Sequence, residues 1–351
     1  VSYIKFQKKI IFNNENSLNN IIVYKNDEVK NFYLLFSIDE DINLYKYDQG
    51  KISIKNNENI FFGHLIYSHI NKENEFYFSS INSKIVKKDK INENLISKNI
   101  KFHHWPHIGK KNIYIPSYDH TLKKKRKFEY FLKLIKHSEN LKHCDFKYNN
   151  LPVIDAVEIL DTSLNNKKKF SYIYKFLENS DIRNKLSNKR CDDFLHLNFI
   201  YELKEKDTRK IKGSSKGDLL LTFRSFDGVI LINPKSGKII FDYQIINSKP
   251  HSGFINQNGN LILLDNTSQK NTRVVEVDPL SKNIIGEFYN ENYQTETRGL
   301  IYEVGINKYI TLYNSVGKIV YIDCENLVNY NCNHSILIDS YNQISGVSVN
   351  Y

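Results

Sequence analysis

Short runs of β-branched and aromatic residues recur along this chain of 351 residues, separated by turns rich in Gly, Asn, Asp and Ser. Runs of this length and composition predict β-strands, and the residues between them are those that turn conformations favour. The chain is therefore predicted to be all-β. The predicted strands cover residues 32–37, 76–80, 112–116, 219–223, 229–233, 238–243, 260–264, 273–277, 309–313 and 318–322.

One segment, from about residue 167 to residue 190, breaks this pattern. Its apolar residues approximate the period of a helix rather than that of a strand. One or two short helices are predicted there, packed against a sheet as a lid or buttress. The apolar positions are Phe170, Ile173, Phe176, Leu177, Ile182 and Leu186.

A histidine repeatedly precedes a predicted strand in the same sequence frame. His64, His104, His196 and His251 have this position, and Arg298 has it in the last copy. Repeats of about 40 to 50 residues with several strands each are typical of propeller blades. The longer interval between His104 and His196 contains the predicted helices. We therefore predict a β-propeller of about six blades, forming a single domain over residues 1–351.

Equivalent positions at the start of the innermost strands converge at one end of a propeller channel. A functional role is therefore favoured for His104, His196 and His251, because imidazoles brought together by symmetry are costly to bury without a purpose. For His64 and His120 the functional and structural interpretations stay open. An ordinary structural or surface role is expected for the remaining isolated histidines, namely His69, His137, His143 and His334.

The formal charge of +11 raises the question of a polyanionic partner, and the densest basic run is Lys123 to Lys127. No zinc-finger spacing, helix-turn-helix signature or base-stacking motif accompanies this run, so we expect a solvated loop and no nucleic-acid partner. Positive potential is still suited to attracting a sulfated or phosphorylated small substrate. No apolar stretch of membrane-spanning length occurs in the sequence. Since the chain begins at Val1 and contains no Met, we expect a mature or truncated product.

The chain has four cysteines, and none of them forms a C-x-x-C pair, which excludes a zinc ribbon and a thioredoxin motif. Cys324 and Cys332 are the only close pair. They either close a small disulfide loop in an oxidising compartment or are two unrelated thiols, and their spacing leaves both interpretations open.

Several motifs, in their order and spacing, resemble the arylsulfotransferase family, and the similarity extends over nearly the whole chain. The most selective is D-F-L-H-L-N followed by an arginine, and then a histidine followed by Asp-Asn. The motifs are V-Y at 23–24, Y-L-L-F at 33–36, N-L-Y-K-Y-D at 43–48, D-F-L-H-L-N at 193–198, L-T-F-R at 221–224, P-K-S-G-K at 234–238, P-H at 250–251, N-G-N at 258–260, L-D-N at 264–266 and T-R-V-V-E-V-D at 272–278.

This resemblance implies a cofactor-free, PAPS-independent transfer of a sulfuryl group from a phenolic sulfate to a phenol through a sulfohistidine, in the periplasm or outside the cell. A neutral imidazole is a competent nucleophile, and arginines stabilise charge on sulfate oxygens. The resemblance assigns catalysis to His196, His251 and Arg273. Substrate contacts are expected from His104, His107, Asn198, Arg224 and Arg298, with Asn198 either orienting His196 or binding substrate.

The chain departs from the family in one important respect. The family has a further histidine downstream of the arginine, thought to be the residue that is sulfated, whereas after His251 this chain has only His334. Either another histidine takes that role, or the missing residue lay in a lost C-terminal segment, or the protein is a non-catalytic propeller that binds a ligand or a protein. A metal site is less favoured, because no carboxylate stands at a clear ligand spacing from the histidines.

Overall fold

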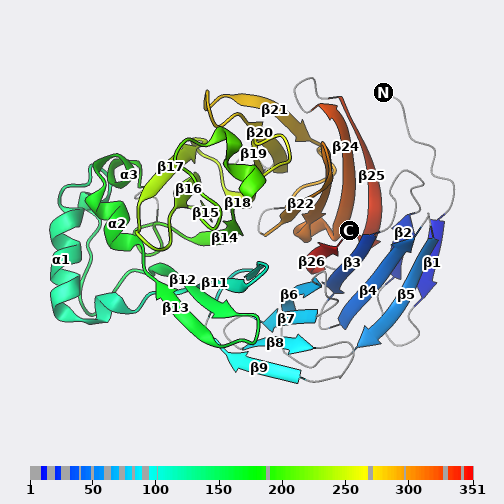
Figure 1. The fold of residues 1–351 in the computed structure, drawn as a ribbon, viewed down its shortest axis with the longest axis horizontal. Helices are drawn as coiled ribbons and strands as arrows, with labels where there is room; N and C mark the ends of the chain where they lie inside the picture. The colour runs from blue at the N-terminus through cyan, green and yellow to red at the C-terminus, as the bar shows by residue number, and fades with distance from the viewer. Residues whose placement is uncertain are drawn as a thin grey trace. The chain divides into compact units, whose positions relative to one another are not determined.

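The computed structural model describes the larger part of the chain and divides it into two compact units (Figure 1). Unit 1 comprises residues 1–99 and 256–351, and unit 2 comprises Ile100–Ile255. The prediction of a single domain over residues 1–351 stays a prediction. The described residues are 9–13, 20–24, 32–38, 41–48, 51–58, 65–70, 76–80, 84–88, 95–100, 102–186, 190–267, 272–295, 298–326, 331–340 and 344–350.

Unit 1 contains antiparallel sheets built mainly from strands that are consecutive in the sequence. One of them joins the two ends of the chain, because β26 (Ile344–Asn350) pairs with β3 (Phe32–Ile38) and is followed in the sheet by β4 (Asp41–Asp48) and β5 (Lys51–Glu58). The other strands of the unit are β1 (Lys9–Asn13), β2 (Asn20–Tyr24), β6 (Leu65–Ile70), β7 (Phe76–Ser80), β8 (Lys84–Lys88), β9 (Leu95–Asn99), β19 (Leu261–Asn266), β20 (Thr272–Val277), β21 (Ile284–Tyr289), β22 (Leu300–Gly305), β23 (Lys308–Tyr313), β24 (Lys318–Asn326) and β25 (Asn331–Ser340).

Unit 2 contains two four-stranded antiparallel sheets and the strand β18 (Pro250–Ile255). The first sheet has the order β10 (His107–Ile108), β11 (Asn112–Tyr118), β12 (Asp155–Asp161) and β13 (Asn166–Phe170). The second has the order β14 (Leu197–Glu202), β15 (Leu219–Phe223), β16 (Gly228–Ile232) and β17 (Ile239–Gln244). Four-stranded antiparallel meanders of this kind are typical of propeller blades, which agrees with the predicted fold class.

Every predicted strand is present, with bounds that differ by at most a few residues from those of the structure. The central strands β15 and β16 are buried along their whole length, which explains their nearly continuous apolar sequences. The turn chemistry also matches: in N-G-N at 258–260, Gly259 has a left-handed backbone with φ of 79°, which glycine adopts without a steric penalty.

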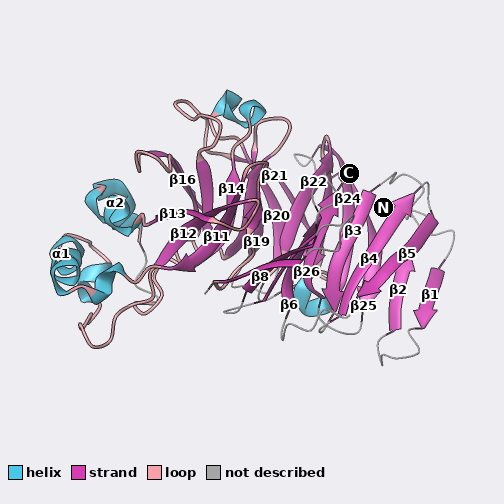
Figure 2. Cartoon of the chain, turned by 60° about the horizontal axis from the view of Figure 1, so that its bottom comes forward, coloured by secondary structure: helices cyan, strands magenta, loops and turns pink. Residues whose placement is uncertain are grey.

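The helices pack on unit 2 and are α1 (Lys125–Ile135), α2 (Ile173–Glu178) and α3 (Ser180–Lys185), with α1 and α2 drawn beside β12 and β13 in Figure 2. The predicted helices of segment 167–190 are confirmed as α2 and α3, although its first residues belong to β13. Asn179 caps α3, since its side-chain oxygen accepts a hydrogen bond from Ile182 N at 3.0 Å.

The prediction of a loop at the basic run is wrong, because Lys123 is the last residue of a short 3-10 helix (Thr121–Lys123) and residues 125–127 form the first turn of α1. The helix has an apolar stripe, Phe128, Phe131 and Ile135, whose side chains are buried in the core of unit 2. Burying each of these side chains contributes about 1.5–3 kcal/mol. The basic side chains themselves are exposed, as expected for a solvated surface.

Two disulfides are present in the structure. Cys324 and Cys332 are directly opposite each other on β24 and β25 and are bonded, which decides between the two interpretations left open by their spacing. The Cys144–Cys191 disulfide was not predicted, because its partners are 47 residues apart in the sequence. Two disulfides are consistent with an extracytoplasmic location. Among the described residues, no helix is long and apolar enough to cross a membrane.

Candidate functional site

The repeated position that carries the histidines lies at the start of the first strand of a meander. His196 immediately precedes β14, His251 is the second residue of β18, and His104 lies shortly before β10. The backbone of His196 is left-handed, with φ of 58°, and Arg298, just before β22 in unit 1, has φ of 64°. His104 and His251, at the same repeat position, do not have this conformation. His64 lies outside the described residues.

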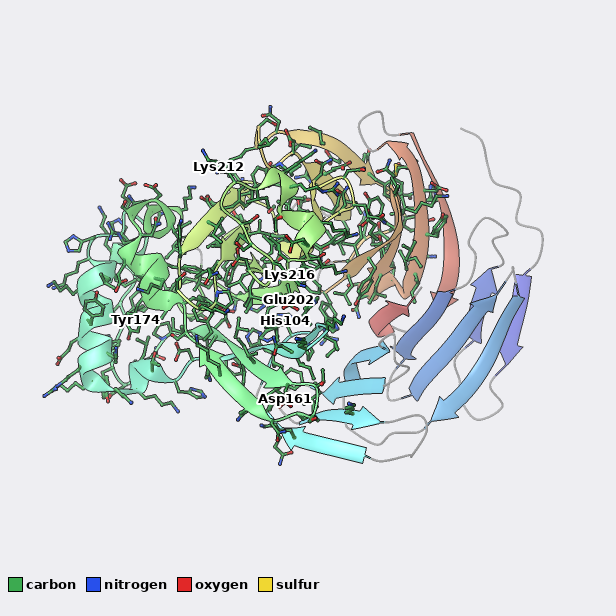
Figure 3. The ribbon with its side chains drawn as sticks, in the orientation of Figure 1. His104, Asp161, Tyr174, Glu202, Lys212 and Lys216 are labelled. Atoms are coloured by element: carbon green, nitrogen blue, oxygen red, sulfur yellow. A yellow bond between two sulfur atoms is a disulfide. The ribbon has the colours of Figure 1, made fainter. Side chains whose placement is uncertain are left out.

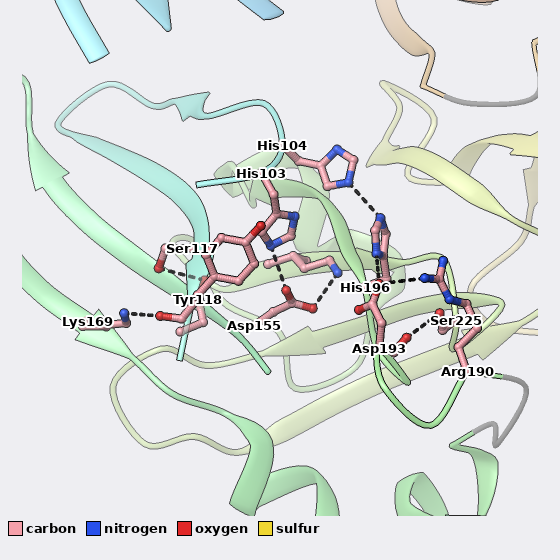
Figure 4. Close-up of polar contacts among 12 residues, drawn as sticks. His103, His104, Ser117, Tyr118, Asp155, Lys169, Arg190, Asp193, His196 and Ser225 are labelled. Atoms are coloured by element: carbon pink, nitrogen blue, oxygen red, sulfur yellow. Dashed lines mark hydrogen bonds and ion pairs between the residues drawn. The ribbon is translucent and has the colours of Figure 1, made fainter. Parts of the chain in front are cut away.

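Unit 2 brings His104, His196 and His251 together, and His103 joins them. Figure 4 shows His103, His104 and His196 of this cluster. The ring centroid of His104 is 5.0 Å from that of His196, 6.3 Å from that of His251 and 5.0 Å from that of His103. The Nε2 atoms of His104 and His196 are 3.0 Å apart, so one ring donates a hydrogen bond to the other. His251 is buried, with 2% of its surface exposed.

Asp193 orients His196 from the other edge of the ring. Asp193 Oδ2 accepts a hydrogen bond from His196 Nδ1 at 2.5 Å. The loop that carries both residues is fixed by the turn after β15: Ser225 Oγ donates to the carbonyl of Asp193 at 2.9 Å, and the amide of Arg224 donates to the carbonyl of His196 at 3.0 Å. A carboxylate, an imidazole and a second imidazole, that of His104, therefore form one continuous chain.

A second carboxylate, that of Asp155 at the start of β12, contacts both the backbone beside His196 and the ring of His103. Its Oδ2 accepts a hydrogen bond from the amide of Leu197, the residue after His196, at 2.8 Å. Its Oδ1 lies 2.7 Å from His103 Nε2, which is ion-pair distance, although the angle is not that of an aligned hydrogen bond. Asp155 is completely buried, so its interactions fix the backbone beside His196 and the ring of His103 at the same time.

Asn198 connects the two strands that carry His196 and His251. Its Nδ2 donates to the carbonyl of Pro250, the residue before His251, at 2.8 Å. The side chain is fully buried, and its Oδ1 has no hydrogen-bond partner within the described part of the chain. Asn198 therefore links β14 to the start of β18 and positions the backbone beside His251, while the predicted contact with substrate stays a prediction.

The electrostatics of the cluster keep His104 neutral. Burial of His104, followed by the positive charge of the neighbouring histidines and Arg224, lowers its pKa well below the ordinary value of 6.5. Burial raises the pKa of Asp193, but the hydrogen bond from His196 and the nearby positive charges outweigh this effect, so that the pKa falls below its ordinary value. At neutral pH, His104 has a free lone pair and Asp193 is ionised.

Arg224 lies beside these groups at the end of β15 and is partly buried. Within the described residues, its guanidinium forms no hydrogen bond and no ion pair, and burial, followed by the charge of Arg190, lowers its pKa. Arg190 is 3.9 Å from Asp193 Oδ2 and is about half exposed. The charge of Asp193 opposes this lowering of the Arg224 pKa. A partly desolvated cation that is not held in an ion pair is suited to binding an anion.

The other predicted residues have surroundings of their own. His107, on β10, packs among the rings of Tyr114, Phe199 and Tyr201. Arg273 belongs to unit 1 and makes ion pairs of 2.9 Å with both Asp265 and Glu287.

Arg298, also in unit 1, is partly buried, and its burial lowers its pKa. The roles predicted for His107, Arg273 and Arg298 stay predictions. His334 Nε2 lies 3.2 Å from Asn290 Nδ2. The ring of His334 also contacts the rings of Phe288 and Tyr293.

Three residues of the cluster received no role in the sequence analysis. His103 is adjacent to His104, and the histidine pair itself was the available signal. Asp193 stands three residues before His196 within a motif whose histidine alone was assigned a role. Asp155 is the only charged residue between Leu151 and Val157, in a run that becomes a buried strand, and such a residue is seldom buried without a partner.

A metal centre is not supported by the part of the chain that the structure describes, since no group of three or more His, Cys, Asp or Glu side chains there has an arrangement able to hold a metal ion. Figure 3 shows His104 among the strands of unit 2, whereas Tyr174 lies at the helices. The candidate site is therefore built from strand termini and the loop before β14, and the helices serve as a buttress.

No protein-family model matches this sequence, and no curated protein matches it significantly. These two comparisons therefore give no support to the resemblance to arylsulfotransferases. Solved structures are similar. A protein of unknown function from Bacteroides caccae has a TM-score of 0.56 at 12% identity, with 92% of this chain and 99% of that chain covered.

A chain of a nidogen/laminin complex has a TM-score of 0.51 at 9% identity, with 91% of this chain and 98% of that chain covered. A periplasmic gluconolactonase of Pseudomonas aeruginosa has a TM-score of 0.50 at 9% identity, with 92% and 99% covered. At such identities the likeness concerns the fold alone. Together with the four-stranded antiparallel sheets, it supports a β-propeller fold, and the number of blades stays a prediction.

Proposed function

We propose that this protein is a histidine-dependent transferase that moves a sulfuryl group from a phenolic sulfate to a phenol, outside the cytoplasm. The observation that carries the proposal is the chain from Asp193 through His196 to His104. It has the logic of a catalytic triad in which a carboxylate orients an imidazole and that imidazole exchanges a proton with the nucleophile. The motifs shared with arylsulfotransferases supply the substrate class.

In the proposed first step, His104 is the nucleophile. His196 Nδ1–H donates to Asp193, so His196 Nε2 accepts the proton of His104 Nε2 and leaves the lone pair of His104 Nδ1 available. This lone pair attacks sulfur, the bond between sulfur and the phenolic oxygen breaks, and the phenolate leaves with the electron pair. The positive charge that develops on His104 is relieved as its Nε2 proton moves to His196.

In the second step the acceptor phenol attacks the sulfohistidine. The bond between sulfur and His104 Nδ1 breaks, the proton returns from His196 to His104 Nε2, and the acceptor's hydroxyl proton is released. The free enzyme is restored without a cofactor.

Arg224 is the proposed contact for the sulfate oxygens. It combines partial burial with a guanidinium that forms no ion pair among the described residues. An arginine in such surroundings stabilises charge on transferring oxygens more strongly than an exposed one. This arrangement favours an anionic donor and is consistent with the sulfate ester that the motifs imply.

The test is a transfer assay with 4-nitrophenyl sulfate as donor and phenol as acceptor. Nitrophenol release should depend on the acceptor and fall by about 10²-fold or more in His104→Ala and His196→Ala, the range general acid–base groups supply. His137→Ala is the matched control, since His137 is exposed beyond the end of α1 and should leave the rate unchanged. Absence of release from well-folded wild-type protein would contradict the proposal and favour a binding propeller.

A further inference from the structure

The proposed transfer needs an acid that protonates the leaving phenolic oxygen. The Asp193–His196 pair does not provide it, because His196 acts as a base in the first step. In an in-line displacement, the leaving oxygen lies on the far side of sulfur from the attacking nitrogen. His196 contacts the opposite edge of His104, at Nε2, and in the proposed first step it accepts the proton of that atom. A poor leaving group such as phenolate therefore needs a proton from another residue.

His103 is the other imidazole that has a carboxylate beside it. Asp155 Oδ1 is 2.7 Å from its Nε2, and the exposed fractions of the two side chains are 11% and 1%. The carboxylate therefore faces the imidazole at a distance suited to fixing the orientation of its ring. The amide of Leu197 holds the other carboxylate oxygen, so Asp155 is fixed and cannot turn away.

The position of His103 suits a role in the same reaction. Its ring centroid is 5.0 Å from that of His104 and 5.9 Å from that of His196, and the ring of Tyr118 packs on it at 4.8 Å (Figure 4). Because Nε2 faces Asp155, the nitrogen that remains for a substrate is Nδ1. His104 is thus flanked by two imidazoles, each with its own aspartate.

We propose that His103 is a catalytic residue that protonates the leaving phenolic oxygen through Nδ1 and takes the proton of the acceptor phenol in the second step, with Asp155 as its positioning residue. The proposal rests on the proposed transferase function. The proton balance closes over the two steps, because the proton given to the first phenol is recovered from the second. His196 then exchanges a proton with the nucleophile His104, and His103 exchanges a proton with the leaving and attacking phenols.

The experiment compares donors that differ in the leaving group. His103→Gln and the control His137→Gln are assayed with phenyl sulfate, which has a poor leaving group, and with 4-nitrophenyl sulfate, which has a good one. For His103→Gln, kcat/KM should fall by about 10²-fold or more with phenyl sulfate and by less than about tenfold with 4-nitrophenyl sulfate. Asp155→Asn should show the same selective loss, with folding checked by circular dichroism.

The outcomes separate the two proposals. If the wild-type protein transfers from neither donor, the proposed function itself fails, and this inference with it. If the wild-type protein is active and His103→Gln loses the same factor with both donors, or loses nothing, the role of His103 is overturned while the transferase stands. If Asp155→Asn does not fold, the leaving-group dependence of His103→Gln decides alone.

Discussion

The Cys144–Cys191 disulfide should stabilise unit 2 more than the Cys324–Cys332 disulfide stabilises unit 1. A cross-link reduces the chain entropy of the unfolded state by an amount that grows with the length of the closed loop. For partners 47 residues apart this effect is about 4 kcal/mol at 25 °C, and for partners 8 residues apart it is about 2.5 kcal/mol. Replacing both cysteines of the first pair by Ser should therefore lower the free energy of unfolding by about 4 kcal/mol.

The chain offers a convenient assay, because its single tryptophan, Trp105, is fully buried and adjacent to His104 in unit 2. Urea unfolding followed by Trp105 fluorescence reports the stability of that unit, and far-UV circular dichroism reports the whole chain. The matched control replaces Cys324 and Cys332 by Ser. An equal or larger loss of stability in the control, or no loss in the Cys144/Cys191 variant, would refute the loop-length reasoning.

The remaining predictions concern the cluster itself. Asp193→Asn should lower kcat by about 10²- to 10⁴-fold in the nitrophenyl sulfate assay with little change in KM, because the charge that stabilises the His196 imidazolium is lost; an unchanged kcat would remove Asp193 from the mechanism. The pKa of Asp193 lies below its ordinary 3.8, so the stability it contributes is present above that value and is lost as the pH falls through the folded-state pKa. His196→Gln should therefore reduce the loss of stability below about pH 4, measured by acid titration of thermal melting, and an identical acid profile would contradict this. Asn198→Ala should cost about 1–3 kcal/mol in urea unfolding, since the carbonyl of Pro250 is left without its side-chain donor, whereas a cost below 0.5 kcal/mol would show that the contact is dispensable. Arg224→Gln should raise KM for the sulfate donor, and a change in kcat alone would argue against its role in binding the anion.

The sequence predicts the strands of this fold well because their apolar runs and turn residues act locally. Residues 219–223, for example, form a strand with unchanged bounds. Helix α1 was not predicted, because a run of five basic residues hides the start of the stripe formed by Phe128, Phe131 and Ile135. The stripe becomes visible only when its burial against the sheets is known, since tertiary packing rather than helix propensity stabilises such a segment.

In the candidate site, too, the sequence predicts the features that depend on local patterns and misses those that depend on contacts between distant residues. The repeat places His104, His196 and His251 at equivalent strand starts, and the structure brings them together. The partners that tune these histidines come from other strands and loops. Asp155 lies 42 residues before Leu197, the residue whose amide it binds, and no spacing rule connects the two. Repeat analysis therefore identifies the imidazoles but not the carboxylates that give them different roles.

Because the backbone of His196 is left-handed, folding alone does not require a histidine at this position, whereas the proposed activity does. A residue with a β-carbon incurs about 1–2 kcal/mol in this conformation, whereas glycine adopts it freely, although glycine also has more entropy to lose on folding. A glycine at position 196 should therefore fold about as well as the histidine. In a library randomised at this codon, sorting for thermal stability alone will accept glycine and asparagine beside histidine, whereas sorting for turnover will retain histidine alone. The comparison of the two sorted pools is a direct measure of what the imidazole contributes.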